Sequence, residues 1–474
     1  MNSRTGFSKE KEILQNINLE HPDYVGRKAM WRKYRDLYVG GEQLKANASE
    51  YLTPRQKEPT DVYSERLSKV FYENYAGSII DWYAATLFRR EPELHIEGLA
   101  TSGRKFFNDF ADDCDLKGAT LSDFFRKQLI EALVCGVSYT LVDFPKCAIP
   151  AGTRAEEDLI GASRAYLVDY PADSLINWSF DSRGSFEWIV LRTEYLRKSG
   201  PDAPSFEKET LWRYYDRTTY RVYRKGAERD STIELIDEGR HALAAQERVP
   251  LFELRVSDGL WLMNKAGLLQ LEHFNKSNAL SWALTMGLFA TPVIYSERPW
   301  NQIVGEAYYI QLGPNDRFGW TEPEGHVYQI ASENLSRLQE EIYRVCYLMT
   351  QATGLHTPAS AQSGLSKMRD FAITQEVLRA YGDAVKDTMK RIIRAVQAAR
   401  CDELQVDVSG LDDFDIRDFS TDLQDAERLL SLGIESPTLK RQVLKRLAYK
   451  YLCDVRQEVK DRIATEIDES FERN

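Results

Sequence analysis

The densest group of residues that could coordinate a cation is acidic and lies in the C-terminal part of the chain. It runs from Asp402 to Asp425 and includes Asp412, Asp413, Asp415 and Asp418. Carboxylate oxygens are the ligands that divalent cations such as Ca²⁺ prefer, but the segment lacks the glycine and the distal glutamate of a calcium-binding loop. The pattern therefore favours a solvated turn, with a weak divalent-cation site as the alternative. We expect no resident metal or cofactor.

The other residues that could do chemistry are dispersed. The six histidines and six cysteines are far apart, and no Cys-x-x-Cys pair occurs. Free thiols in a reducing compartment are expected. The chain has no GxxxxGK[ST] loop for nucleotide phosphates, no GxSxG turn for a nucleophilic serine and no HExxH motif for zinc. We therefore assign no catalytic residue, and a role other than enzymatic is predicted.

One stretch stands out because it carries no charge. Between Arg344 and Lys367 there is no Lys, Arg, Asp or Glu, although 28% of the chain is charged. Its central part, GLHTPASAQSGLS at 354–366, has small residues and a proline, which is typical of a loop. Two interpretations remain open. The segment is either a flexible connection or a loop that lies near a polyanion without binding it, because positive charge would add affinity for phosphates and negative charge would repel them.

Two long helices are predicted to position this loop. Before it, Ser332 could cap a helix whose apolar residues recur with helical spacing up to a stop at Gly354. After it, residues 367–400 contain one glycine and no proline, and four apolar residues fall on one seven-spaced line, namely Phe371, Leu378, Val385 and Ile392. At 1.5 Å per residue, this second helix would be about 50 Å long.

A further helix and a small insert precede them. Residues 260–289 form a helical pattern with apolar positions that include Leu268 and Phe274, and Pro292 ends it. Residues 290–331 contain four prolines, four glycines and seven aromatic residues, a composition that favours short strands and turns. The predicted order is helix, β-rich insert, helix, neutral loop and very long helix.

This order resembles that of the portal proteins, the head-to-tail connectors of tailed bacteriophages. The N-terminal half adds residues to the resemblance, since the segment from Tyr51 to Leu94 is similar to the opening helical block of the portal wing. Read by itself, this segment predicts a helix that Asp61 caps and Pro92 closes. SLINW at 174–178 is also similar to a wing segment.

Strands are expected after this helical block. Two near-copies, LVDFP at 141–145 and LVDYP at 167–171, are typical of strand ends. Alternating segments between Ser185 and Pro250 indicate an antiparallel sheet with one wet face. Near the C-terminus, a strand and a turn are expected within 401–420. Two short helices should follow, separated at Gly433, and the second should have Ser436 as its cap and Pro437 at its first helical position.

The resemblance implies an α+β portal-type subunit that divides along the chain as follows: wing, 1–258; first stem helix, 259–289; clip, 290–331; second stem helix, 332–353; tunnel loop, 354–366; spine helix, 367–400; return to the wing, 401–420; crown, 421–474.

It also implies a ring, usually of twelve subunits, around a channel for double-stranded DNA. Three groups of site residues follow from it: in the tunnel loop and at the head of the spine helix His356, Ser360, Gln362, Ser363 and Lys367; in the channel wall of the stem Lys276, Arg337, Glu340 and Arg344; and at the clip interface Trp300, Tyr308, Tyr309 and Trp320. The implied partners are the terminase large subunit, the head-tail connector protein and the major capsid protein. The implied location is one capsid vertex of the virion, and the host cytoplasm during assembly.

Composition fits such a subunit. At 474 residues the chain should hold two to four substructures, and 43% hydrophobic residues suffice for sizeable cores. No signal peptide is expected, and the longest apolar run, near 133–142, is too short to span a bilayer. The net charge of −11 argues against a conventional DNA-binding protein, which needs a basic patch, but suits a channel wall along which DNA must slide. The alternative is a DNA-processing enzyme, not a ring, with a dispersed active site.

Overall fold

The computed structural model describes residues 16–98, 101–146, 154–198, 206–225, 232–287, 291–296, 312–321, 325–348, 364–412, 419–431, 436–452 and 455–472. The structure mixes helices and sheets, which confirms the predicted α+β class. The chain divides into two compact units: unit 1 comprises Met1–Arg35, Ile80–Asn264 and Phe371–Asn474, and unit 2 comprises Asp36–Ile79 and Lys265–Asp370. Each unit is described separately below.

Four helices contain the points at which the chain passes between the units: α2 (Pro22–Val39), α6 (Tyr75–Leu87), α10 (Leu262–Gly287) and α13 (Gly364–Arg400). The other elements of unit 1 are β1 (Glu93–Glu97), α7 (Thr101–Asp112), α8 (Leu121–Cys135), β2 (Val137–Asp143), α9 (Arg154–Leu159), β3 (Tyr166–Tyr170), β4 (Leu175–Phe180), β5 (Phe186–Arg197), β6 (Glu207–Asp216), β7 (Thr219–Lys225), β8 (Glu234–Arg240), β9 (Leu251–Arg255), β12 (Gln405–Ser409), α14 (Phe419–Ser431), α15 (Pro437–Tyr451) and α16 (Gln457–Glu472). Two short 3₁₀ turns, Ala172–Ser174 and Ala242–Gln246, accompany them.

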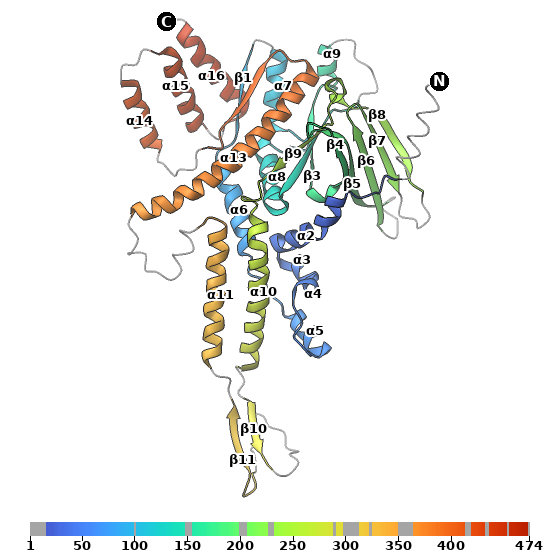
Figure 1. Cartoon of the computed structure of the whole chain (residues 1–474). Helices are drawn as coiled ribbons and strands as arrows, with labels where there is room; N and C mark the ends of the chain where they lie inside the picture. Colours follow the sequence, from blue (N-terminus) through green and yellow to red (C-terminus); the bar gives the residue numbers. More distant parts are fainter. Residues whose placement is uncertain are drawn as a thin grey trace. The chain divides into compact units, whose positions relative to one another are not determined.

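The described residues of unit 1 form three antiparallel sheets (Figure 1). The largest has the strand order β4-β5-β6-β7-β8. Its strands β5 to β8 lie between Ser185 and Pro250, where the alternating pattern predicts an antiparallel sheet, and β4 precedes that stretch. The second has the order β3-β2-β9, and within it the two near-copies pair with each other, Leu141 opposite Val168 and Val142 opposite Leu167. The third joins β1 to β12, which confirms the predicted C-terminal strand.

Helix α8 and strand β2 form the centre of the core of unit 1. Thr120 caps α8 by accepting a hydrogen bond from the Asp123 amide, and Gly136 ends it in the left-handed region at φ 85°. A Cβ atom on Gly136 would lie 3.1 Å from the Trp261 ring. The indole N–H groups of Trp31 and Trp261 donate to the carbonyls of Cys135 and Val134, which have no partner inside the helix.

Helix α13 confirms the predicted very long helix, and its 37 residues correspond to about 55 Å. Leu378, Val385 and Ile392 are at most 1% exposed, as their seven-residue spacing predicts. The side chain of Phe371, the fourth residue of that line, lies outside the described part of the structure. The single glycine, Gly382, lies so close to the backbone of Leu411 that a Cβ atom would be only 2.2 Å from the Leu411 carbonyl oxygen.

The C-terminal helices begin where the sequence indicates. Ser436 caps α15 by accepting from the Leu439 amide at 3.2 Å, and Pro437 takes the first helical position. Helix α16 packs on α7 and β1 within unit 1.

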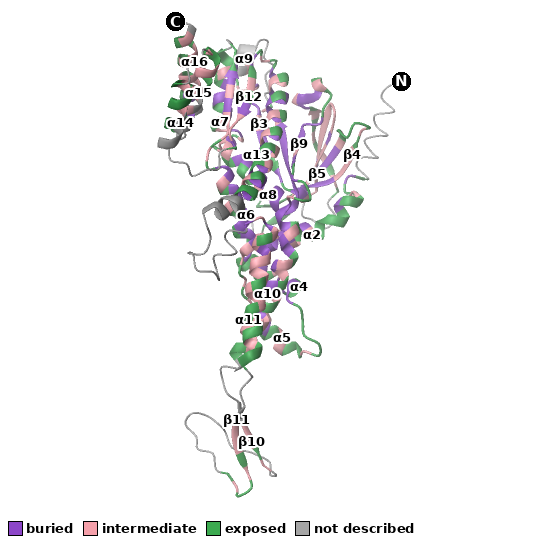
Figure 2. Ribbon diagram, turned by 60° about the vertical axis from the view of Figure 1, so that its left-hand side comes forward, coloured by how far each residue is buried: buried purple, intermediate pink, exposed green. Residues whose placement is uncertain are grey.

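The other elements of unit 2 are α3 (Gly41–Ala46), α4 (Ala48–Tyr51), α5 (Thr60–Ser68), β10 (Thr291–Tyr295), β11 (Arg317–Thr321) and α11 (Gly325–Val345). Strands β10 and β11 form an antiparallel hairpin, and α10 and α11 lie side by side (Figure 1). Both helices are mainly exposed or half-buried toward the end that carries the hairpin (Figure 2).

Three helix boundaries differ from the predictions. Helix α11 begins at Gly325, so Ser332 is an interior residue and not a cap, and the helix ends at Val345, well before Gly354. The single helix predicted from Asp61 to Pro92 is instead two helices, α5 and α6, separated by residues 69–74. Pro59, not Asp61, precedes the first of them.

Candidate functional site in the α10–α11 helix pair

Helices α10 and α11 form an antiparallel pair in unit 2. Two contacts join them: the Lys276 ammonium donates to the Asn334 amide oxygen at 2.9 Å, and the Tyr328 hydroxyl donates to the Ala283 carbonyl at 3.3 Å. A third contact follows just after the end of α11, where the Lys265 ammonium donates to the Tyr347 hydroxyl. Along these contacts the residue number rises in α10 as it falls in α11. The register therefore holds over the described length of the pair.

The buried side of α10 is more polar than its sequence pattern predicts. Leu268, which the helical pattern places on the apolar side, is 63% exposed, whereas Gln270 is fully buried and Asn278 is 8% exposed. Phe274 is buried as expected, at 1%. A helix can bury amide side chains only if their donors and acceptors are satisfied, because an unpaired buried polar group costs about 1–3 kcal/mol.

The partners of these amides are main-chain atoms of residues 51–76, which also belong to unit 2. Gln270 accepts from the Ala76 amide at 3.0 Å and donates to the Glu73 carbonyl at 2.7 Å. Asn275 and Asn278 bind the main chain in the same two-bond manner, at Tyr51 and Thr53 for Asn275 and at Phe71 for Asn278. We refer to Gln270, Asn275 and Asn278 as the amide group. Gln270 and Asn278 hold the segment between α5 and α6, and the start of α6, against α10, whereas Asn275 holds the end of α4 and the residues that follow it.

The end of the pair away from the hairpin, which includes Gln270, is also held by aromatic and buried apolar side chains. Ile342 and Cys346 are at most 1% exposed. The ring of Tyr75 lies 5.1 Å from that of His273 and 6.3 Å from that of Tyr343. Burial lowers the pKa of His273, opposed by the Glu73 carboxylate 3.4 Å away, so the imidazole is neutral at pH 7. This end of the pair is a packed core.

Charged side chains on the exposed sides of the pair balance one another. Lys276 pairs with Glu272 at 3.0 Å, and Arg344 pairs with Glu341 at 2.6 Å. Arg337 is exposed and makes no ion pair with any residue that the structure describes, and Glu340 is half-buried. Across the described parts of the pair the four basic residues Lys265, Lys276, Arg337 and Arg344 match the four acidic residues Glu272, Glu333, Glu340 and Glu341.

Near the hairpin the pair exposes apolar side chains. Leu284 of α10 is 41% exposed, and Val327 and Ile330 of α11 are 63% and 53% exposed. The Tyr328–Ala283 hydrogen bond places these three residues at the same end of the pair. We refer to Leu284, Val327 and Ile330 as the apolar patch. These side chains leave apolar area that is open to contact with another chain.

Many of the predicted site residues lie outside the described part of the chain. This is so for His356, Ser360, Gln362 and Ser363 of the loop and for Trp300, Tyr308 and Tyr309 of the insert. Lys367 lies in α13 and Trp320 lies in β11 opposite Pro292, but their side chains fall outside the description. The structure therefore brings together, of these sets, only Lys276, Arg337, Glu340 and Arg344, on one helix pair.

Other chemistry is sparse among the described residues. They contain no group of three or more His, Cys, Asp or Glu side chains that could hold a metal ion, and the acidic residues 413–418 lie outside the description. Cys114, Cys135 and Cys346 are buried free thiols, and Cys401 is an exposed one. Within the same described ranges, no helix is long and apolar enough to cross a membrane.

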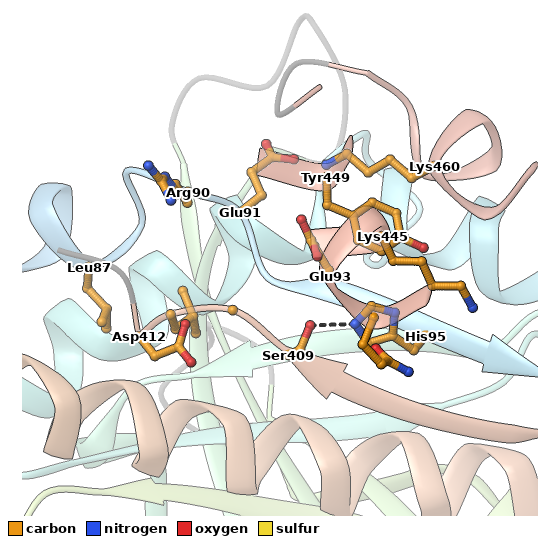
Figure 3. Close-up of a pocket in the computed structure, with 13 residues that line it drawn as sticks. Leu87, Arg90, Glu91, Glu93, His95, Ser409, Asp412, Lys445, Tyr449 and Lys460 are labelled. Carbon is orange, nitrogen blue, oxygen red and sulfur yellow. Dashed lines mark hydrogen bonds between the residues drawn. The ribbon is translucent and has the colours of Figure 1, made fainter. Parts of the chain in front are cut away.

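Unit 1 contains a cavity of about 360 Å³ that no sequence pattern indicates, between the β1–β12 sheet and the helices α15 and α16 (Figure 3). His95 of β1 and Ser409 of β12, which are diagonal neighbours in the strand pair, share a hydrogen bond at 2.6 Å. Burial lowers the pKa of His95 and raises that of the neighbouring Glu93 carboxyl. The period-two pattern of these short strands gives no signal of the cavity, because the cavity forms only when β1 is joined to β12 and the C-terminal helices, more than 300 residues later in the sequence.

Comparisons with known proteins give structural similarity only. No family model matches the chain, and no curated protein matches it in sequence. Three solved structures that contain similar chains are described as the neck of an empty gene transfer agent (GTA) particle computed with C6 symmetry, the virion of a native GTA particle, and the neck of a native GTA particle computed with C12 symmetry. The identities are 14%, 14% and 13%, and the TM-scores are 0.43, 0.42 and 0.39. The matches cover 86%, 84% and 85% of this chain and 98%, 96% and 99% of those chains.

Proposed function

We propose that this protein is a portal protein, a ring-forming subunit through which double-stranded DNA passes into and out of a phage-type capsid. The observation that carries the proposal is the order of elements: helix α10, the β10–β11 hairpin, helix α11, an uncharged segment and the 37-residue helix α13, followed by a strand, β12, that returns to pair with β1. This is the order in which stem, clip, stem, tunnel loop, spine and wing follow one another in the portal family.

In this proposal the α10–α11 pair is the stem, and Lys276, Arg337, Glu340 and Arg344 lie in the channel wall. The matching numbers of basic and acidic residues support this role, because favourable and unfavourable contacts with phosphates then nearly cancel along the DNA. The loop residues His356, Ser360, Gln362 and Ser363, with Lys367, would line the narrowest part, where small uncharged side chains allow several copies to crowd together.

The apolar patch supports assembly into a ring. Leu284, Val327 and Ile330 are exposed in the single chain, and a neighbouring copy would cover them in a heterologous contact that closes. The proposed partners are further copies of the chain, twelve in the ring as is usual in the family, and the major capsid protein. The terminase large subunit and the connector protein would bind at the clip, through Trp300, Tyr308, Tyr309 and Trp320. The protein would act at one vertex of the virion, without a catalytic step.

The test is assembly of the purified chain, followed by electron microscopy of negatively stained particles. We expect closed rings with a central opening. Replacing Val327 and Ile330 by serine should shift the protein to smaller species by removing apolar area, whereas Ile236→Ser, a matched change at an exposed residue of β8, should leave the rings intact. A protein that stays monomeric at high concentration and at every salt concentration would overturn the proposal and favour a DNA-processing enzyme.

A further inference from the structure

Two helix N-termini of unit 1 meet at a cavity that the proposed portal function does not use. The cavity has a volume of about 330 Å³. Thr120, Leu121 and Ser122 line it from the start of α8, and Arg456 and Lys460 line it from the start of α16. The two helices are 15 and 16 residues long. Each N-terminus carries a partial positive charge and main-chain N–H groups that lack partners within the helix.

The main-chain donors at the start of α8 are available. Two amides in the first turn of α8 already have partners. The Asp123 N–H donates to the Thr120 hydroxyl at 3.0 Å, and the Phe124 N–H donates to the Thr120 carbonyl at 3.0 Å. The amides of Leu121 and Ser122 donate to no acceptor among the residues that the structure describes. Both residues line the cavity. An anion there could accept from both N–H groups, in the manner of phosphates at helix N-termini.

Lys460 is the second and independent observation. The residue is only 3% exposed, yet its ammonium makes no ion pair and no hydrogen bond within the described parts of the chain. It lines both this cavity and the neighbouring one, in which it is shown in Figure 3. The carboxylates of Glu93 and Asp112 act on this ammonium only through space, without an ion pair or a hydrogen bond, so the N–H donors of a buried lysine face the cavities and are open to a ligand.

The remaining charges leave the cavity positive. Arg89 and Arg456 add two guanidinium groups, and neither forms an ion pair with a described residue. Two acids, Glu91 and Asp112, oppose these three cations. Burial raises the pKa of the Asp112 carboxyl, although Arg456 opposes that shift. The cavity thus combines a net positive charge with oriented N–H donors.

We propose that this cavity binds a small oxyanion of the phosphate type, with the Lys460 ammonium as its buried counter-charge and the amides of Leu121 and Ser122 as its hydrogen-bond donors. The anion would join α16 to α8, two helices that are more than 300 residues apart in sequence. Its binding would therefore stabilise the docking of the C-terminal helices on the rest of unit 1. This inference does not rest on the portal assignment.

The test uses the full chain and inorganic phosphate. The thermal unfolding midpoint is measured against phosphate concentration at fixed ionic strength and pH, with chloride as the replacement anion. We expect a saturable rise in the midpoint, because a ligand that binds only the folded state stabilises it. Lys460→Met should weaken phosphate binding about 10- to 100-fold, which is the range expected for losing one hydrogen bond to a charged group.

Two further variants separate binding in the cavity from a general effect of charge. Asp112→Asn removes a repelling carboxylate with little change of shape and should tighten phosphate binding. Arg462→Gln removes the same charge as Lys460→Met from the same helix, but at an exposed residue outside the cavity, and should leave binding unchanged. If Lys460→Met does not fold, Asp112→Asn and Arg462→Gln still decide the matter. A rise in the midpoint that none of these changes alters, or no saturable rise at all, would overturn the proposal.

The phosphate could be a free ion or the end group of a polynucleotide. Inorganic phosphate, a 5′-phosphorylated dinucleotide and the same dinucleotide without its 5′-phosphate distinguish these sources. A Lys460-dependent response to inorganic phosphate identifies the free ion. A response to the phosphorylated dinucleotide alone identifies an attached phosphate and retains the site. Equal responses to both dinucleotides would show that the 5′-phosphate is not recognised and would contradict the proposal.

Discussion

At the scale of single residues, Arg400 shows how a buried charge is accommodated in unit 1. Its side chain is 1% exposed, its Nε donates to the Asp402 carboxylate at 2.7 Å, and it also donates to the Ser163 carbonyl. The guanidinium lies 3.7 Å from the centre of the Phe106 ring. In contrast to Lys460, this cation is paired on several sides. Breaking such a buried pair typically costs about 3–5 kcal/mol, because the remaining partner is left charged and dry.

We therefore predict that Arg400→Met lowers the free energy of unfolding by about 3–5 kcal/mol, as measured by urea denaturation. Adding Asp402→Asn should restore part of this loss, since the buried carboxylate no longer lacks a counter-charge. Arg379→Met is the control, because Arg379 pairs with Glu376 on the exposed side of α13 and should change stability by less than about 1 kcal/mol. Additive losses in the double variant would show that Arg400 and Asp402 are not coupled.

At the scale of elements, α10 is held by amides that pair with a main chain. Gln270→Met keeps the length of the side chain but leaves the Ala76 N–H and the Glu73 C=O without their partner. We predict a loss of about 2–4 kcal/mol in the free energy of unfolding, for two unsatisfied groups that are partly able to reach water. Hydrogen exchange should speed up in residues 70–76 before it does elsewhere in unit 2.

The matched control is Gln329→Met on α11. This amide is exposed and bonds only to Glu333, four residues along the same helix, among the contacts described for it. We expect a change of less than about 0.5 kcal/mol and unchanged hydrogen exchange in residues 70–76. If both variants lost similar stability, side-chain entropy and not main-chain pairing would account for the effect.

Much of the element order could be predicted from periodicity and capping residues. The very long helix, the antiparallel strands between Ser185 and Pro250, the strand at 405–409 and the Ser436 cap all have local signals that the structure matches. The break between α5 and α6 has no such signal, because the amides that stabilise residues 70–74 come from α10, about 200 residues later. The same main-chain contacts explain why Gln270 is buried while Leu268 is exposed, which is the opposite of what their hydrophobicity predicts.

The candidate site could be predicted less well. Periodicity locates α10 and α11 but does not show which charged side chains pair. The sequence predicts a start at Ser332, seven residues after the observed start of α11 at Gly325, because serine is a favoured N-cap residue. Lys276 bonds to Asn334, a contact that only the register of the helix pair determines. The cavity at Lys460 depends on two helix starts that no local pattern relates to each other.

At the scale of the whole molecule, the acidic net charge of −11 and the balanced charges of the helix pair predict weak adhesion to DNA in the assembled ring. We predict that Glu340→Lys, which raises the net charge of each copy by two, increases the affinity of the rings for linear duplex DNA. The affinity should also fall more steeply as the salt concentration rises. Filter binding or fluorescence anisotropy between about 50 and 200 mM salt measures both quantities.

The control is Glu194→Lys, an equal change of charge on the exposed face of strand β5 in unit 1. If the channel wall includes Glu340, the control should alter the salt dependence much less than Glu340→Lys does. Equal effects of the two variants would show that DNA senses only the total charge of the protein and would remove Glu340 from the proposed channel.

The amide group on α10 also has a consequence for natural variation. Gln270, Asn275 and Asn278 recognise only main-chain atoms, which every residue except proline supplies in full. Relatives of this protein should therefore accept many different side chains at Phe71 and Glu73, while they exclude proline at 53, 71 and 76, whose N–H groups are donors. The three amide side chains themselves should vary little among relatives. The two partners in the same hydrogen bonds, the amide positions on α10 and the main-chain positions within 51–76, would then diverge at very different rates.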